Sequence, residues 1–293
     1  MPFSRKSTLE KIEKAQQSGA RDTAWSALGV GEKLSLIGVG VIVLIALVGP
    51  AVMPYSPIIP SGGQLEPPLS SGHVLGTDVL GMDMATRLVA GMQRSLFAAL
   101  VVTLVSAAIG TLIGVAAGFK GGWLDTALMR FTDLFLAFPA MIIAMAIAAA
   151  IGQSLGSAMI GIIVVWWPLY ARLVRGEVRR VVALPHVQAA RVSGVKGWRL
   201  LWRHVIPAIT PTVVVTASLD IGAVVMTLAA LSFIGLGTPA PAPELGRMAS
   251  DGMKYFLNAW WVAVLPSVVI GLLAFAFNYA GDAIRVVLRR TGV

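Results

Sequence analysis

The stretch HVQAARVSGVKGWRLLWRHVIP, residues 186–207, carries four lysines and arginines and a central glycine, and it ends on a proline. Long apolar stretches lie before and after it. A basic segment of about one helix between two apolar runs is unusual for a soluble domain. It is typical of a loop that leaves a membrane between two spanning helices, on the side where lysine and arginine accumulate.

The composition of the whole chain supports this interpretation. Of its 293 residues, 57% are hydrophobic and only 13% are charged, and the mean hydropathy is +0.81. A soluble chain usually carries about a quarter charged residues, so we expect a membrane protein. The net charge of +9 is divided among basic clusters that apolar runs separate, which argues against a basic face for nucleic acid. The absence of cysteine excludes disulfides and thiolate metal sites.

Six segments are long and apolar enough to cross about 30 Å of membrane hydrocarbon as helices. They lie at residues 34–53, 95–118, 134–151, 157–175, 208–237 and 261–281. In the second segment, Gly110, Gly114 and Gly118 recur at every fourth position, which lines small residues along one face and lets another helix approach closely. We therefore predict an all-α integral membrane protein with six transmembrane helices.

The distribution of lysine and arginine predicts the orientation. With both termini in the cytoplasm, 19 of the 23 basic residues lie in cytoplasmic segments, as the positive-inside rule requires. The predicted organisation is a basic cytoplasmic segment at 1–33, a first transmembrane helix at 34–53 and an outer loop at 54–94. A core at 95–293 follows, with five transmembrane helices and a cytoplasmic loop at 176–207.

The cytoplasmic loop should itself contain a helix. Residues 188–193 can form one short helix, in which Ala189 and Ala190 permit the close approach of a partner. Gly194 breaks or bends that helix. A second helical piece follows, with an apolar face made by Trp198, Leu201 and Trp202. The alternative is an interfacial helix that only anchors the spans on either side of it.

Motifs for nucleotide, metal or hydrolytic chemistry are lacking in this sequence. No Gly-Lys pair occurs, so there is no phosphate-binding P-loop, and none of the three histidines belongs to an H-E-x-x-H zinc pattern. Residues 152–156 match the G-x-S-x-G nucleophile pattern, but they lie between two apolar helical runs, where a tight helix–helix turn explains them better. We expect neither enzyme activity nor a metal site in this chain.

One acidic residue lies within a predicted span. Asp220 is in the fifth segment, where a carboxylate is costly unless it faces protein, water or a partner. It is a candidate pore or gate residue, and a satisfied hydrogen bond is an equally good explanation. If Asp220 coupled transport on its own, the chain would be a self-sufficient secondary transporter or channel. Such proteins need inverted repeats or several buried charges, and the sequence shows no convincing repeat.

The spacing in the cytoplasmic loop resembles a known family. Gln188-Ala189-Ala190 is followed by Gly194 four residues after Ala190, and Pro207 comes thirteen residues after Gly194. This pattern is similar to the EAA loop of ABC importer permeases, and a proline is tolerated where the next span begins. In that family the loop forms a coupling helix that docks into a groove on the ATPase subunit. Gln188 replaces the family's leading glutamate, which removes any charged contact of that glutamate without changing the expected helix.

Three further stretches narrow the resemblance. They are HVLGTDVLGMDMATRLVAG at 73–91, LSFIGLG at 231–237 and NYAGDAIR at 278–285. All three resemble the C-type permease subunit of dipeptide, oligopeptide and nickel importers. Together with the loop they occur in the family's order, so the resemblance covers most of the chain from residue 73 onward.

The resemblance implies a type I ABC importer permease fold in the bacterial inner membrane. This chain would form half of a pore for peptides, together with a homologous second permease subunit. Two cytoplasmic ATPase subunits would bind ATP and Mg, and an extracytoplasmic binding protein would deliver the substrate; membrane lipid is a further expected partner. The chain itself would hold no cofactor. The implied ATPase-coupling residues are Gln188, Ala189, Ala190, Arg191, Ser193, Gly194 and Pro207.

Overall fold

The computed structural model describes residues 29–70, 72–195 and 197–290, with side chains as far as 288. The predicted basic segment at 1–33 therefore lies largely outside the described residues. Helices joined by irregular segments, without a β-sheet, make up the described part, which confirms the all-α prediction. The helices are α2 (Val30–Val52), α3 (Met84–Lys120), α4 (Gly122–Leu136), α5 (Ala140–Ile151), α6 (Leu155–Val182), α7 (Pro185–Val192), α8 (Gly197–Leu200), the π-helical turn η1 (Leu201–Val205), α9 (Ile206–Phe233), α10 (Leu245–Met253) and α11 (Trp260–Arg290).

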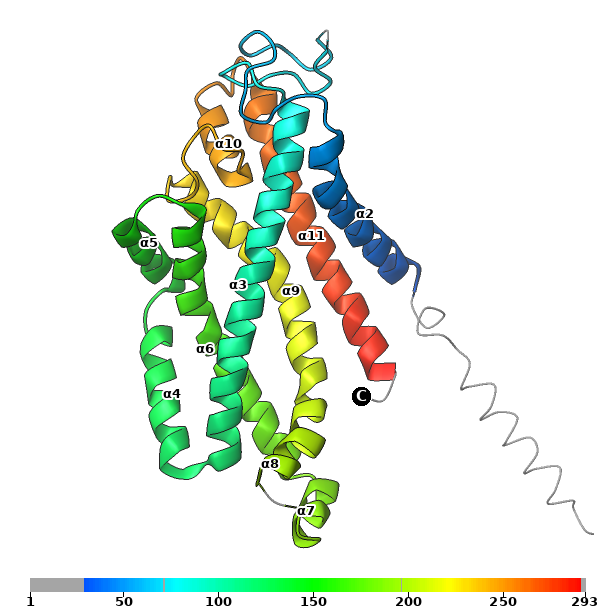
Figure 1. Ribbon diagram of the computed structural model, residues 1–293, viewed down its shortest axis with the longest axis vertical. Coiled ribbons are helices and arrows are strands. Elements are labelled where there is room, and N and C mark those ends of the chain that lie inside the picture. Colours follow the sequence, from blue (N-terminus) through cyan, green and yellow to red (C-terminus); the bar gives the residue numbers. More distant parts are fainter. Residues whose placement is uncertain (1–28, 71, 196, 291–293) are drawn as a thin grey trace, which may run out of the picture.

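The long helices run side by side and alternate in direction (Figure 1). Within the described residues five helical units are long and apolar enough to cross a membrane: α2, α3, α6, residues 197–233 and α11. A sixth span results if α4 and α5, which are bent by 81° at a short break, are taken together. The end of α11 and α7 lie toward one end of the bundle and α10 lies at the other, while α2 begins at about mid-height and runs toward the α10 end (Figure 1).

The third span differs from its prediction as one straight helix over 134–151. The chain instead forms α4, a break of three residues, and α5, which begins directly after Pro139. Proline lacks the N–H needed for a helical hydrogen bond and pushes the preceding residue, here Phe138, away from helical geometry. The segment at 119–133, which separates the predicted spans at 95–118 and 134–151, is mostly the helix α4 and not a loop.

Other boundaries also differ. Helix α3 begins at Met84, whereas the prediction placed residues up to 94 in an outer loop. Asp83 allows this earlier start, because its carboxylate accepts hydrogen bonds from the Thr86 N–H and the Thr86 hydroxyl, both at 2.8 Å, and so caps the helix. At the other end of the bundle α6 continues to Val182, well into the loop predicted at 176–207.

Helices α3 and α6 pack closely along the glycine-lined face that the sequence predicts. A Cβ atom added to Gly110 would lie 2.5 Å from the Trp167 carbonyl oxygen, and one added to Gly114 would lie 2.6 Å from the Ala171 oxygen. At Gly118 the corresponding distance, to the Arg175 oxygen, is 2.9 Å. The two backbones are therefore in contact, as is usual for small-residue interfaces in membranes.

An irregular segment at 53–83, here called the cap, covers the end of the bundle beside α10 (Figure 1). Buried polar pairs hold the cap in place. His73 Nδ1 lies 2.9 Å from Asp83 Oδ1, with both side chains about 4% exposed, and the Trp261 indole N–H of α11 donates to the Thr77 carbonyl at 3.1 Å. The motif at 73–91, which the sequence marks only by resemblance, is therefore the joint between the cap and α3.

Arg87 completes this joint. Its guanidinium pairs with Asp78 of the cap at 3.1 Å and donates to the carbonyl oxygens of Pro57 at 2.9 Å and Pro241 at 3.0 Å. One side chain of α3 thus connects the cap with the segment that leads from α9 to α10. Because both charges are about 8% exposed, loss of either partner would leave a buried unpaired charge.

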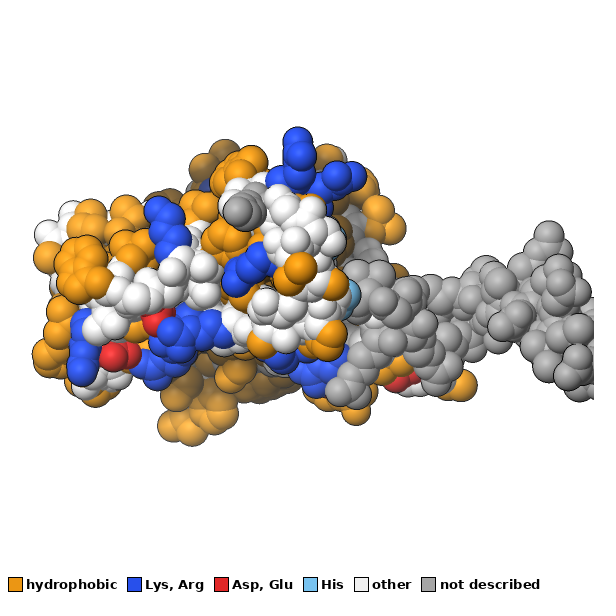
Figure 2. Space-filling view, turned by 90° about the horizontal axis from the view of Figure 1, so that it is seen from below, with side chains coloured by type: hydrophobic (Ala, Val, Ile, Leu, Met, Phe, Trp, Pro, Cys, Tyr) orange, Lys and Arg blue, Asp and Glu red, His pale blue; other side chains and the backbone are white. Residues whose placement is uncertain are grey.

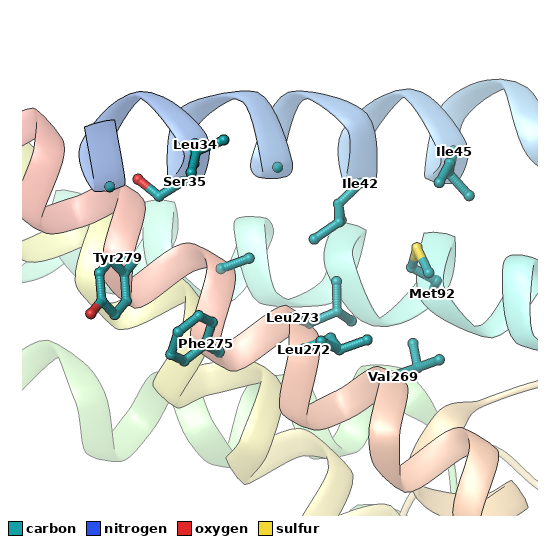
Figure 3. Close-up of a pocket in the computed structure, with 13 residues that line it drawn as sticks. Leu34, Ser35, Ile42, Ile45, Met92, Val269, Leu272, Leu273, Phe275 and Tyr279 are labelled. Atoms are coloured by element: carbon teal, nitrogen blue, oxygen red, sulfur yellow. The ribbon is translucent and has the colours of Figure 1, made fainter. Parts of the chain in front are cut away.

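Helix α2 lies at the edge of the bundle and is the most exposed of the long helices. It touches its neighbours mainly near its end, where Ala46 is buried and Gly49 approaches Val89 so closely that an added Cβ would lie 2.5 Å from Cγ1. Toward its start α2 diverges from α11 and leaves an apolar groove of about 590 Å³. Figure 3 shows this groove between α2, α3 and α11, with Ile42, Met92 and Leu273 pointing into it.

We expect the substitution Gly114→Leu to prevent the contact between α3 and α6. Its side chain would meet the Ala171 carbonyl oxygen and Val174, which are backbone and branched atoms that cannot move aside easily. Overpacking of this kind costs about 1–3 kcal/mol or more. The thermal unfolding midpoint of the detergent-solubilised protein should fall. Gly176→Leu is the matched control, because Gly176 lies on an exposed face of α6 where an added Cβ meets nothing within 4 Å; equal unfolding temperatures for the two variants would contradict the prediction.

Candidate coupling helix and translocation face

Helix α7 is a short helix at the end of the bundle, set apart from the parallel long helices (Figure 1). It begins with Pro185, which suits the first turn because the missing N–H would have no helical partner there. The Gln188 side-chain amide donates to the Val182 carbonyl at 2.7 Å. Gln188, the position of the family's glutamate, thus ties α7 back to the end of α6.

One face of α7 is anchored in a small apolar cluster. Val187 is fully buried there, and half-buried Ala190 packs against the same cluster. The other buried members are Val115, Val174, Val178, Val181, Leu200, Val205 and Ile209. An isolated helix of eight residues is not stable in water, and burying one valine contributes about 1.5–3 kcal/mol. Helix α7 therefore depends on this anchor, which joins it to both α6 and the start of α9.

The opposite face of α7 is free. Ala189, Arg191 and Ser193 are exposed, as a docking face requires, and Val192 has 89% of its surface exposed. The sequence carries no signal for Val192, since one valine in a basic loop forms no distinctive pattern. An apolar side chain projecting from an otherwise polar helix face is a candidate contact for a partner.

Gly194 ends α7 in a defined geometry. It has a positive φ of 89°, its N–H bonds to the Arg191 carbonyl at 3.1 Å, and the Val195 N–H bonds to the Ala190 carbonyl at 3.0 Å. This pair of hydrogen bonds is the Schellman motif, which glycine favours because other residues are strained at positive φ. The predicted bend at Gly194 is therefore a helix C-cap.

Pro207 lies apart from α7, as the second residue of α9. Between them are α8 and the π-helical turn η1, where the sequence predicted a single helical piece. Trp198 and Trp202 are exposed and contact each other edge to face, with ring centroids 5.2 Å apart. Trp rings in this position are typical of the membrane–water interface.

The end of the molecule that carries α7 is rich in basic side chains. Figure 2, which views this end, shows lysine and arginine spread over it and few acids. Some of the arginines are neutralised within the chain: Asp125 of α4 pairs with Arg175, at 2.5 Å, and with Arg179, and Asp133 pairs with Arg172 at 2.6 Å. These pairs hold α4 against α6.

Other cations at this end remain available. Arg191 and Arg199 are exposed, and neither forms an ion pair with another described residue. Lys196, between them, lies outside the described residues. The α7 region thus offers a partner both uncompensated positive charge and an apolar contact.

Asp220 is half-buried in α9 and has a defined partner. The Trp166 indole N–H of α6 donates to its carboxylate at 3.2 Å, and Tyr170, one turn further along α6, lies beside it without hydrogen-bond geometry at its hydroxyl. Asp220 thus has a hydrogen-bond donor within the chain, and the contact joins α6 to α9. The carboxylate is only partly enclosed and so remains accessible from one side.

Asp220 belongs to a polar stripe on α9. Thr212, Thr216 and Asp220 are spaced by four residues and so lie on one face of the helix. Thr212 and Thr216, the two members of the stripe nearer to the start of α9, line a polar cavity of about 570 Å³. The lining residues are Arg180, Pro211, Thr212, Val215, Thr216, Arg285 and Leu288. A polar stripe that leads into such a cavity is the best candidate in the described chain for a surface along which a hydrophilic solute could move.

Comparison with known proteins gives this arrangement a family. Residues 110–290 match the family described as binding-protein-dependent transport system inner membrane component. The chain is 36% identical over 259 residues to the probable D,D-dipeptide transport system permease protein DdpC of Escherichia coli strain K12, which covers 87% of each chain. It is 36% identical over 258 residues to the dipeptide transport system permease protein DppC of Alkalihalophilus pseudofirmus, which covers 86% of this chain and 84% of that one. It is 37% identical over 216 residues to the glutathione transport system permease protein GsiD of Pectobacterium atrosepticum, which covers 74% and 72%.

A solved structure supports the fold independently. A chain of the MetNI methionine ABC transporter in an inward-facing conformation superposes with a TM-score of 0.55 at 20% identity, covering 70% of this chain and 96% of that one. This likeness confirms the type I ABC importer permease fold. Together with the family match over more than half of the sequence, it shows that the chain belongs to the binding-protein-dependent transport system inner membrane components, as a multi-pass ABC importer permease subunit.

Proposed function

We propose that this permease subunit forms half of a pore for di- or oligopeptides and pairs with a homologous second permease. The names of the relatives, which transport dipeptides, D,D-dipeptides and glutathione, support a peptide substrate. Family membership argues against the self-sufficient secondary transporter, since such a protein would need its own energy coupling. An extracytoplasmic binding protein would select the peptide and deliver it.

The observation that carries the proposal is the construction of α7. It is anchored on one face through Val187 and free on the other, where Ala189, Arg191 and Val192 are exposed. We infer that this free face docks on a cytoplasmic ATPase subunit, two of which would bind ATP and Mg for the transporter. Closure of the ATPase dimer would then move α7, and through Val187 the ends of α6 and α9.

The same assignment gives the orientation. With α7 in the cytoplasm, the end of α11 also faces the cytoplasm, because it lies toward the same end of the bundle, and α2 runs outward toward the α10 end (Figure 1). The cap and α10 then face outward, where a binding protein would dock. Most of the arginine and lysine would lie inside, in agreement with the positive-inside rule.

We infer further that the stripe of Thr212, Thr216 and Asp220 faces the translocation path. Hydroxyl and carboxylate groups offer hydrogen bonds to a peptide without binding it tightly, which a pathway needs. The polar cavity between α6, α9 and α11, which Thr212 and Thr216 line, would be the cytoplasmic exit of this path.

The composition of the complex tests the proposal first. A tagged chain, purified gently from its native membrane, should bring down a second permease, ATPase subunits and a peptide-binding protein. Mass spectrometry identifies them, and the ligand released from the binding protein identifies the substrate. Recovery of the chain alone, with transport in liposomes that needs no ATP, would refute the proposal.

We expect Gly194→Leu to abolish ATP-driven uptake while assembly stays intact. A leucine at a φ of 89° costs about 1–2 kcal/mol in strain, and its bulk would stand on the docking face. Assembly should survive, because a Cβ at this position meets nothing within 4 Å of the chain itself. Peptide uptake in proteoliposomes and co-purification of the subunits are the two measurements.

Gly194→Asn is the control for this experiment, because asparagine tolerates the left-handed conformation better than other residues. It should retain most of the uptake that leucine loses. Normal uptake by Gly194→Leu would remove α7 from the coupling mechanism.

We expect Asp220→Asn to reduce peptide uptake with little change in stability. The amide keeps the size of the side chain and can still accept the Trp166 hydrogen bond, so the free energy of unfolding should change by about 1 kcal/mol or less. Trp166→Phe is the control, since it removes the donor and keeps the charge. Wild-type uptake by Asp220→Asn, or an equal loss of stability in both variants, would reduce Asp220 to a purely structural role.

A further inference from the structure

A second apolar groove lies on the other side of α2 from the one in Figure 3. It has a volume of about 440 Å³ and runs between α2, α3 and the first residue of α6. Its lining residues are Val43, Ala46, Leu47, Gln93, Arg94, Leu96, Phe97, Leu100 and Leu155. The lining is apolar except for two adjacent residues of α3, Gln93 and Arg94.

Arg94 differs from the other arginines at this end of the described structure. Arg87 pairs with Asp78, and Arg247 pairs with Asp251 at 2.9 Å. Arg94 is half-buried and forms no ion pair with any described residue, and Arg87 two turns away adds a repulsive charge. A guanidinium in this position is available to an anion from outside the chain.

The depth of the groove suits a lipid headgroup. Leu155 is the first residue of α6, and Leu47 lies five residues before the end of α2, which is about 8 Å along a helix. Arg94 therefore lies close to the level at which two spanning helices reach the membrane surface. Below it, Phe97 and Leu100 continue the groove along α3 toward the interior of the membrane, and both are exposed.

We propose that this groove binds one phospholipid, with the phosphate at Arg94 and Gln93 and an acyl chain along Phe97 and Leu100. The guanidinium can donate two parallel hydrogen bonds to phosphate oxygens, and the Gln93 amide can donate a third. In the orientation proposed above, this lipid belongs to the outer leaflet. Only that leaflet assignment rests on the proposed function; the groove and its cation do not.

Charge distinguishes this groove from the larger one in Figure 3. That groove has no charged lining residue, so any acyl chain would fill it without preference for a headgroup. In the groove beside Arg94, the cation matches the phosphate of an anionic phospholipid and the apolar channel matches one of its acyl chains. A soluble anion would leave the apolar channel unused, and an apolar helix would leave the cation unpaired.

The experiment measures lipid retention by the full transporter. Delipidated complex in detergent is titrated with phosphatidylglycerol and analysed by native mass spectrometry. We expect one tightly retained lipid in the wild type and an apparent Kd about tenfold weaker in Arg94→Gln, since the charge-assisted bonds to phosphate are lost. Leu100→Trp, which fills the channel and keeps the charge, should weaken retention as well.

Two controls make the result specific. Lys254→Gln removes one exposed cation at the same end, away from the groove, and should retain lipid as the wild type does. Unfolding temperatures in lipid-free detergent show whether each variant is folded. Wild-type retention by both Arg94→Gln and Leu100→Trp would overturn the proposal. It would also be overturned if inorganic phosphate displaced the lipid, which indicates a simple anion site, or if a carbodiimide cross-linked an Arg94→Lys variant to an acidic residue of a companion subunit, which indicates a protein partner.

Discussion

The contact between α3 and α6 is the constraint on which the rest of the structure depends. Backbone oxygens of α6 approach Gly110, Gly114 and Gly118 so closely that no side chain fits between them. In a membrane the hydrophobic effect does not drive helices together, so close packing of this kind has to hold the bundle. Helix α3 carries the cap at one end and α6 carries α7 at the other. The cap and α7, at opposite ends of the subunit, are therefore both attached to one closely packed pair of helices.

The arginines of this helix bundle fall into two groups, those paired with an acid and those without such a partner in the part of the chain that the structure describes. Where helices pack on one another, arginines are neutralised locally, as Arg175 is by Asp125 and Arg87 is by Asp78. Where the surface is open, cations such as Arg191 at one end and Arg94 at the other have no partner among the described residues. For these two sites we propose external partners, an ATPase surface for Arg191 and a phospholipid for Arg94. We therefore propose that the excess positive charge of the sequence serves to bind partners, in addition to fixing the orientation in the membrane.

The sequence predicts the parts of this structure that depend on local pattern. Hydrophobic length predicts the spans, the glycine spacing predicts the α3 interface, and the loop pattern with Gly194 predicts the short helix α7 and its end. Contacts between distant segments leave no such pattern. The pairing of His73 with Asp83 and the neutralisation of Arg175 by Asp125 depend on tertiary structure, so the cap and helix α4 were predicted as loops. The 81° bend between α4 and α5 has a local signal in Pro139. The apolar run on both sides of this proline nevertheless favours the prediction of one continuous span.

The arrangement of α6 and α9 limits how a displacement of α7 could reach the pore. Val187 enters a cluster to which α6, η1 and α9 all contribute, so a force on α7 acts where α6 and α9 meet. Some distance along the same two helices, Trp166 and Asp220 join them again. Between α7 and α9 lies the π-helical turn η1, a rare type of turn that occurs often at functional sites. Helix α6 is fixed to α3 by the glycine contact, and α9 carries the polar stripe that we propose lines the path.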